Sequence, residues 1–266
     1  MKLYILNYSS YRSDLDSMDV KSELKKTYKL DTRRQNKFIH LGLLGAKRLE
    51  EKVDICVDDE LYITSGIGNI GIIQKATQCN FENELMPIFD FINILGNSTS
   101  FYISKALSIK GKSLFQISDN FSFINTLIII YASLYESKKS AILGSIDLLS
   151  EPEEIIKRVL GVEKECALTS SVNYQKLSLS STGAIAEVEF DTNFYSLEEL
   201  KEILEANSTP VYGSMRCSQL ECIKEDKFFQ MEIAHTINSM IELKKEMIYI
   251  DCFEDKFKIL RLKILV

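Results

Sequence analysis

The stretch that decides the fold runs Ser113-Leu-Phe-Gln-Ile117, then Ser122-Phe-Ile-Asn-Thr-Leu-Ile-Ile-Ile-Tyr-Ala-Ser-Leu-Tyr135, then Ala141-Ile-Leu-Gly-Ser-Ile-Asp147. The two short apolar runs predict strands, and the longer apolar run between them predicts a buried helix. A strand, a helix and a second strand in succession are typical of a layered α/β protein.

The same alternation continues on both sides of this stretch. Toward the N-terminus the sequence predicts strands at 2–7 and 61–65, the second running into a glycine turn, and helices at 33–52, 88–95 and 100–107. After Ser150-Glu-Pro152 the pattern begins again, with a helix through 157, strands at 173–179, 184–190, 247–250 and 258–265, and helices at 197–205 and 226–245. The sequence therefore predicts an α/β fold in two halves, residues 1–150 and 151–266.

The composition argues against several classes of protein. With 266 residues, 45% hydrophobic and 26% charged, the chain is long enough for one sizeable core. A net charge of −6 disfavours a nucleic-acid surface, which needs clustered Lys and Arg. The most apolar stretch, 121–134, is interrupted by polar residues and is shorter than the roughly 20 residues that span a bilayer. We expect no signal peptide and no membrane segment, hence a cytoplasmic protein.

The sequence offers little for a metal or a cofactor. Its six cysteines contain no CxxC pair, and the two histidines, His40 and His235, lie in predicted helices where packing roles are expected. The turn Gly66-Ile-Gly-Asn-Ile-Gly71 has the spacing of a dinucleotide fingerprint. However, the acidic residue about 20 positions later, Asp90, falls in a helical stretch. We therefore expect a tight turn without a ligand, no metal and no cofactor.

Several segments resemble the β-ketoacyl synthase family of the thiolase fold. The helix from Arg33 resembles the family's early Arg-rich helix, and Leu61 to Gly71 resembles its strand and glycine turn. Pro87-Ile-Phe-Asp-Phe-Ile-Asn, 103–112 and the ending 248–262 resemble further family segments, and Ala141–Asp147 resembles the Ala-Leu-Val-Gly-Gly-Val-Asp strand. The resemblance implies a thiolase-like layered fold built from two related halves, the second one shortened.

The resemblance fails at the family's catalytic positions. The nucleophilic cysteine of the family sits between a buried strand and a long helix, where the helix N-terminus favours the thiolate. Alignment places Asp119, Asn120 or Phe121 in that position, and none is a cysteine. The family's Lys-Ser-x-x-Gly-His segment aligns to 216–221, so that Arg216 replaces the lysine and Glu221 the histidine. A carboxylate there would repel the developing enolate charge, and we expect no catalytic residues of the family's kind.

This combination resembles the chain-length-factor-like subunits of type II fatty acid, polyketide and aryl polyene systems. It implies a non-catalytic subunit that partners an active ketosynthase, or a second copy of itself, and shapes acyl-chain elongation. An acyl carrier protein is a further possible partner; nucleic acid and membrane are not expected. Two alternatives stay open. One is an acyl carrier or acyl-CoA binding module, and the other is a condensing or acyl-transfer enzyme that uses non-standard residues.

The resemblance also implies a dimer interface. In the family, the strand before the catalytic elbow pairs with its copy across a two-fold axis. The corresponding residues here, Leu114, Phe115, Gln116 and Ile117, are mostly apolar, as an edge strand that must be covered would be. The helix that follows is apolar on more than one side. We expect dimerisation through both elements.

Overall fold

The computed structural model describes residues 1–266 except 17, 119 and 225–230. Its described strands form one mixed sheet in the order β3-β2-β4-β5-β1-β6-β9-β8-β7. The strands of the first part are β1 (Lys2–Arg12), β2 (Glu60–Ser65), β3 (Ser113–Ile117), β4 (Ala141–Asp147) and β5 (Ser171–Ser178). Those of the second part are β6 (Ala186–Phe190), β7 (Val211–Gly213), β8 (Met247–Phe253) and β9 (Lys256–Ile264).

The two parts of the sheet repeat one pairing pattern. In the first, β2 is parallel to β3 and β4, and β5 is antiparallel to both β4 and β1. In the second, β7 is parallel to β8, and β9 is antiparallel to both β8 and β6. The strands β1, β2, β4 and β5 therefore correspond to β6, β7, β8 and β9. Among the described residues, β3 has no counterpart in the second part of the sheet.

The strand pairing also bears on where the halves meet. The predicted boundary at residue 150 separates β5 from β1 and β4, with which it pairs along its whole length. We propose to place the boundary between β5 and β6 instead. The antiparallel pairing of Lys2–Ile5 with 186–189 joins the halves, and a β-bulge between Ile5 and Asn7 lies where β1 passes from one part to the other.

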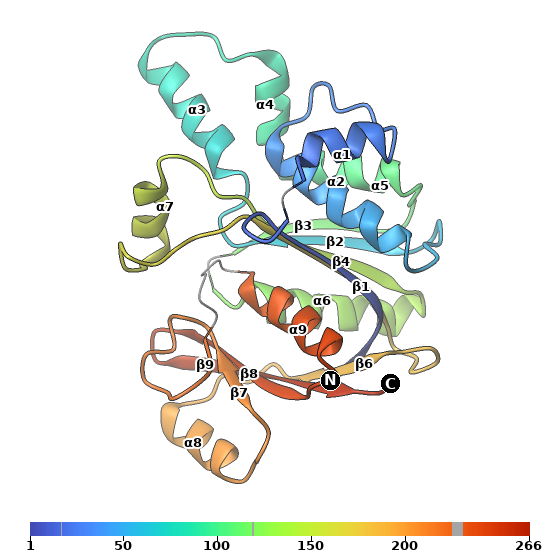
Figure 1. The fold of residues 1–266 in the computed structure, drawn as a ribbon, viewed down its shortest axis with the longest axis vertical. Helices are drawn as coiled ribbons and strands as arrows, with labels where there is room; N and C mark the ends of the chain where they lie inside the picture. The colour runs from blue at the N-terminus through green and yellow to red at the C-terminus, as the bar shows by residue number, and fades with distance from the viewer. Residues whose placement is uncertain (17, 119, 225–230) are drawn as a thin grey trace.

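Helices cover both faces of this sheet in layers (Figure 1). The central helices are α6 (Ser122–Ser137) and α9 (Glu232–Glu242), which lie between the two parts of the sheet. The outer helices over the first part are α1 (Val20–Lys26), α2 (Lys37–Glu50) and α5 (Gly96–Ala106), and α8 (Leu197–Glu205) covers the second. The remaining helices are α3 (Ile70–Phe81), α4 (Ile88–Ile94) and α7 (Glu153–Leu160).

The hydrophobic core follows from the alternation of side chains along buried strands. In β2, Tyr62 faces the central helices, while Leu61 and Ile63 face α2. In β4, Leu143 faces the central helices and Ile142 faces α2. Because both faces are covered, these strands read as continuous apolar runs, which is how the sequence identified them. None of the described helices has the length and apolar character needed to cross a membrane.

Candidate functional site

The site predicted from the resemblance begins at the turn between β3 and α6. Phe121 is the residue that immediately precedes α6, and it has a left-handed backbone conformation with φ 52° and ψ 25°. A bulky residue in this region is rare and costs of order 1–3 kcal/mol, so the surrounding structure must impose it. Asn120 lies one residue earlier, and Asp119 lies outside the described residues. Of the two candidates that the structure describes, Phe121 is the one that directly precedes α6.

Hydrogen bonds between small polar side chains and the backbone hold this elbow. The Ser118 hydroxyl donates to the carbonyl of Asn120 at 3.0 Å, and the Ser122 hydroxyl donates to the carbonyl of Ser118. The Thr126 hydroxyl lies 2.7 Å from the carbonyl of Ser122. These hydroxyl groups donate to carbonyl oxygens, so they stabilise the turn but do not cap the free N–H groups at the start of α6. The turn before α6 therefore ends at Phe121, whose side chain is a phenyl ring.

The Phe121 ring is buried against a second aromatic residue. Its relative exposure is 6%, and it meets Phe194 edge to face with ring centroids 5.3 Å apart. Two lysines lie by the Phe194 ring, with the Lys258 Nζ 4.6 Å and the Lys256 Nζ 5.6 Å from its centroid. Burial lowers the pKa of Lys258, although Asp191 and Asp251 act in the opposite direction. The Phe121 ring thus packs against Phe194 at the tip of the elbow. A phenyl ring has no nucleophilic atom that could form a thioester.

The buried side chain of Asp147 connects the two halves of the chain. Asp147, at the end of β4, accepts hydrogen bonds from the Met231 N–H at 2.7 Å and the Gly66 N–H at 3.5 Å. Burial raises the pKa of Asp147 to about 7, while the two backbone donors act to lower it. The residue connects the start of α9 to the turn after β2, and its place at the end of a buried strand suits a positioning role.

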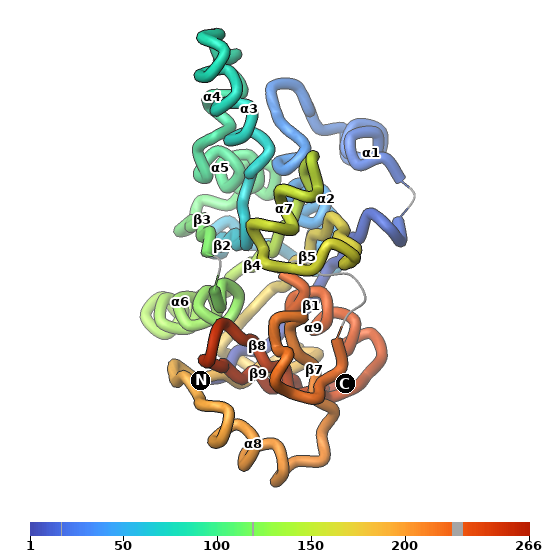
Figure 2. The backbone as a smooth tube through the Cα atoms, turned by 90° about the vertical axis from the view of Figure 1, so that its left-hand side faces the viewer, coloured from blue at the N-terminus to red at the C-terminus, as the bar shows by residue number. Residues whose placement is uncertain are grey.

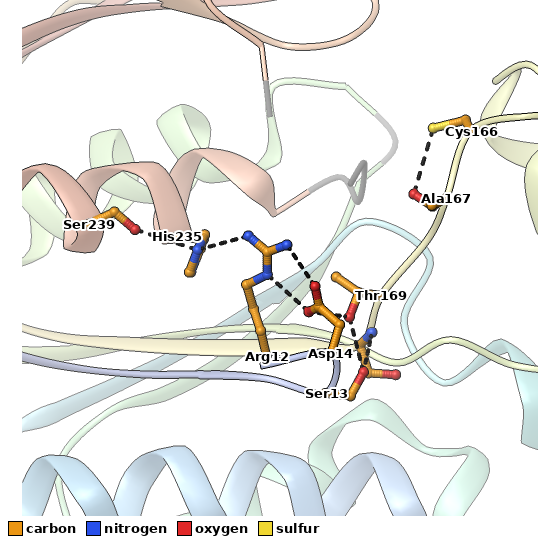
Figure 3. A network of polar contacts seen from close by, with 9 residues as sticks. Arg12, Ser13, Asp14, Cys166, Ala167, Thr169, His235 and Ser239 are labelled. Atoms are coloured by element: carbon orange, nitrogen blue, oxygen red, sulfur yellow. Dashed lines mark hydrogen bonds and ion pairs between the residues drawn. The ribbon is translucent and has the colours of Figure 1, made fainter. Parts of the chain in front are cut away.

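A second polar network, drawn in Figure 3, links the end of β1 to α9. The Arg12 guanidinium donates to Asp14 at 3.1 and 3.2 Å and, through Nη1, lies 3.2 Å from His235 Nε2. Thr169 Oγ1 donates to Asp14 at 2.9 Å. Burial alone would raise the pKa of Asp14, but the hydrogen bonds from Arg12 and Thr169 hold it well below its usual value.

The same network fixes the protonation of His235. Because Arg12 only donates, Nε2 must accept, which places the ring proton on Nδ1. Burial, followed by the charge of Arg12, lowers the pKa of His235 to about 4. The Nε2 lone pair is therefore occupied by Arg12 in a neutral ring. This arrangement matches the packing role expected for His235 and gives it no lone pair for general-base catalysis.

The other predicted site residues, Arg216 and Glu221, lie on the segment between β7 and α9. Arg216 donates to the Leu160 carbonyl at 3.0 Å and lies over the Phe253 ring, with 5.8 Å from Cζ to the centroid. Glu221 is exposed, beside a small depression next to β7.

The predicted interface residues divide between two roles. Leu114 and Ile117 are 37% and 50% exposed on β3, the terminal strand of the sheet. Phe115 instead packs edge to face on Phe38, with centroids 6.1 Å apart, and Gln116 Oε1 accepts from Thr126. Ile117 also packs on the glycine turn, since a Cβ on Gly68 would lie 2.5 Å from Ile117 Cδ1. The Ile117 side chain fills the space next to Gly68. In a dinucleotide-binding turn the pyrophosphate would lie in that space.

The roles of Arg12, Asp14 and Thr169 and the anchoring role of Asp147 were not predicted from the sequence. The signal available for Asp147 was an acidic residue that closes an otherwise apolar strand, which requires buried partners. For the others there was no usable signal. Arg12 and His235 are 223 positions apart, and Asp14 and Thr169 are 155 apart.

A cavity of about 1030 Å³ lies elsewhere, among the start of α2, α3 and the segment after β4. All of its lining residues come from the first 170 positions, and Phe121 is not among them. Its walls combine apolar side chains with three lysines, Lys21, Lys37 and Lys75, and three acids, Asp19, Asp90 and Glu151. Its size suits a small-molecule ligand.

Comparison with known proteins identified the fold. No family model matches the chain, and no curated protein matches it. Among solved structures, the complex of the ketosynthase ApeO with its chain length factor ApeC from Xenorhabdus doucetiae matches 98% of this chain and 99% of its own chain, with a TM-score of 0.64 and 12% identity. The ishigamide ketosynthase/chain length factor matches 100% of both chains, with a TM-score of 0.74 and 9% identity.

A third structure, of a type II polyketide acyl-carrier protein in complex with its ketosynthase, matches 99% of both chains, with a TM-score of 0.65 and 10% identity. At these identities the likeness concerns the fold. The chain has the thiolase-like layered α/β fold of ketosynthases and chain length factors, built from two related halves. The fold predicted from the resemblance is therefore confirmed.

Proposed function

We propose that the chain is a non-catalytic β-ketoacyl synthase-like subunit. In this role it binds an active ketosynthase and shapes acyl-chain elongation in fatty acid or polyketide-type biosynthesis. The observation that carries the proposal is the buried Phe121 ring at the elbow before α6. A condensing enzyme of this fold needs a thiolate at that point, stabilised by the helix N-terminus. Phenylalanine retains the elbow and removes the reaction.

The second half supports the same proposal. At the positions aligned to the family's lysine and histidine, Arg216 is engaged with the Leu160 carbonyl and Glu221 is exposed to solvent. Decarboxylation requires hydrogen-bond donors held at the developing enolate oxygen. A carboxylate at 221 cannot donate such a hydrogen bond, and one N–H group of Arg216 is already bonded to the Leu160 carbonyl.

The edge strand β3 supports a partner. Its Leu114 and Ile117 side chains are exposed on a strand that is unpaired on one side within the described sheet. Exposed apolar edge strands invite pairing with another chain. Two of the similar structures are described as pairing a ketosynthase with a chain length factor, and a third holds an acyl-carrier protein. An active ketosynthase is the proposed partner in the cytoplasm, with a second copy or an acyl carrier as the other outcomes.

Co-purification with the tagged chain from its native host, followed by reconstitution, tests the proposal. The condensing rate of the purified ketosynthase and the length of its products are measured with and without this chain. We expect a change in rate or product length on addition, and no acyl adduct on this chain by intact-protein mass spectrometry. A covalent acyl adduct on it would favour the condensing or acyl-transfer alternative.

The cavity supports one alternative, an acyl carrier or acyl-CoA binding module. Its apolar walls and its three lysines are compatible with an amphipathic anion. The three acidic side chains in the same lining would repel such a ligand. Calorimetric titration of the chain alone with acyl-CoA distinguishes the two proposals. Tight binding without any effect on a ketosynthase would favour the module.

A further inference from the structure

The cavity of about 1030 Å³ lies at an edge of the sheet where several helices begin. It follows the carboxyl ends of β1, β2 and β4, and its lining includes Lys37 at the start of α2, Gly71 at the start of α3 and Pro152 directly before α7. In open α/β sheets, ligands bind outside the carboxyl ends of the strands. Figure 2 shows α1, α2 and α3 on one side of the first part of the sheet and α6 and α9 on the other.

Two of these helices begin at the cavity without a negative charge of their own. The first turns of α2 and α3 contain no acidic residue, and no side chain caps α3. Lys37 is instead a cation at a position where the helix macrodipole favours an anion. The helix α7, by contrast, begins with Glu153 and Glu154. The starts of α2 and α3 therefore favour a negatively charged group in the cavity.

The charged side chains of the lining leave a small positive excess once their contacts are counted. They are three lysines and three acids: Lys21, Lys37, Lys75, Asp19, Asp90 and Glu151. Lys75 pairs with Asp90, and Asp19 accepts from the Ser22 N–H at the start of α1. None of the ion pairs of the described residues includes Lys21, Lys37 or Glu151. Two lysines therefore remain against one carboxylate.

Amide donors in the lining indicate the same kind of ligand. Asn36 caps α2, since its Oδ1 accepts from the Ile39 N–H at 3.0 Å, and this contact identifies the other amide atom as Nδ2. Nδ2 of Asn36 and Nε2 of Gln74 have no hydrogen-bond partner, although both atoms are shielded from solvent. Both side chains line the cavity. Unpaired buried donors cost free energy, so they indicate a bound acceptor.

The lining also contains acceptors that lack a donor. Gln35 Nε2 donates to the Asp31 carbonyl at 3.1 Å, which identifies Oε1 as the acceptor, and Oε1 has no partner. His40 is 5% exposed, and its Nε2 lies 3.1 Å from the Thr32 carbonyl oxygen. Because a carbonyl only accepts, Nε2 carries the proton and Nδ1 is an acceptor, without a partner among the described residues. These acceptors, and the Glu151 carboxylate, suit a ligand that carries hydroxyl groups.

An anionic group and several hydroxyl groups occur together in a phosphorylated sugar. We infer that the cavity binds a sugar phosphate, with the phosphate at the starts of α2 and α3 and the hydroxyl groups toward Gln35 and His40. An acyl chain would leave those acceptors unpaired. A nucleotide base would find no free ring to stack on, because Tyr11 is 7% exposed and has the Arg48 guanidinium over its ring. The inference does not depend on the proposed function.

Isothermal titration calorimetry of the intact chain tests this assignment. Ribose 5-phosphate and glucose 6-phosphate are the probes, and inorganic phosphate, glucose and octanoyl-CoA are the comparisons. We expect a sugar phosphate to bind at least about tenfold more tightly than inorganic phosphate or glucose. Inorganic phosphate that binds as tightly would show an anion site only and overturn the inference. Equally tight glucose, tighter octanoyl-CoA, or no binding of either sugar phosphate would overturn it as well.

The substitution Asn36→Asp tests the recognition of the phosphate. Aspartate caps a helix as well as asparagine and still accepts from the Ile39 N–H, so the variant should melt like the wild type. It replaces the unpaired donor with a carboxylate oxygen, which should weaken sugar phosphate binding at least about tenfold. Lys37→Gln should also weaken binding, and Lys201→Gln on α8 is the control with the same change in charge. An affinity in either cavity variant equal to that of the control would refute the inference.

Discussion

Asp147 gives the sharpest test of the energetics of this fold. Its side chain is buried, and its pKa is raised from 3.8 to about 7. Between these values the native state binds more protons than the unfolded state, so the free energy of unfolding falls as pH rises. The slope reaches about 1.4 kcal/mol per pH unit, and over some three units the loss is at most about 4 kcal/mol.

The substitution Asp147→Asn removes this titration and keeps an oxygen that can accept from the Met231 N–H. Urea unfolding of both proteins is measured at pH 5 and pH 8, at one protein concentration. Relative to the wild type, the variant should gain roughly 2–4 kcal/mol between these pH values. The similarly raised pKa of Asp251 is present in both proteins and cancels from the difference.

A pH-independent difference between the two proteins would refute this reasoning. A difference of the opposite sign would also refute it. That result would mean that the two N–H donors and the start of α9 stabilise the carboxylate more than burial destabilises it. The pKa of Asp147 would then lie below its usual value.

Three further outcomes follow from the structure. The pKa of His235 is lowered from 6.5 to about 4, so this residue should contribute at most about 3 kcal/mol to the free energy of unfolding above pH 6.5, and this contribution should be lost as the pH falls toward 4. An acid titration in which His235→Gln unfolds at the same pH as the wild type would contradict this expectation. Phe121→Cys should not restore condensation, measured as CO₂ release coupled to chain extension, since Glu221 stands where the family has a histidine. Leu114→Lys should fold but should not form a complex with a partner, as measured by light scattering. Phe115→Lys should be insoluble, because Phe115 packs on Phe38. A wild-type chain that stays a stable, monodisperse monomer in the presence of a ketosynthase would contradict both expectations.

The elements with strong hydrophobic signals could be predicted from the sequence. The strands 113–117 and 141–147 match β3 and β4, because both are apolar runs bounded by polar turns. The helix α3 was not predicted, since its apolar residues are interleaved with Gln, Lys and Thr and Ile72 is its one buried residue. The three-residue β7 is too short to carry a pattern. The described part of the predicted helix 226–245 ends at Glu242, and 225–230 lie outside the described residues.

The candidate site could be predicted only where it depends on local sequence. The resemblance placed the nucleophile position among residues 119–121, and Phe121 has a left-handed backbone conformation directly before α6. Which of the three residues occupies that position stays a prediction. The Arg12 network could not be predicted, because it depends on the packing of α9 against the ends of β1 and β5. That packing is a tertiary contact between segments more than 150 positions apart.

The shared strand β1 has a consequence for how the molecule unfolds. Residues 2–5 pair with β6, and residues 4–12 pair with β5, so one strand belongs to the hydrogen-bond ladders of both halves. The central helices α6 and α9 contribute to the same core. Separating the halves would open a backbone edge on each and expose that core at once. The two halves should therefore melt as a single cooperative unit, with one calorimetric transition, even though their strand pairing repeats.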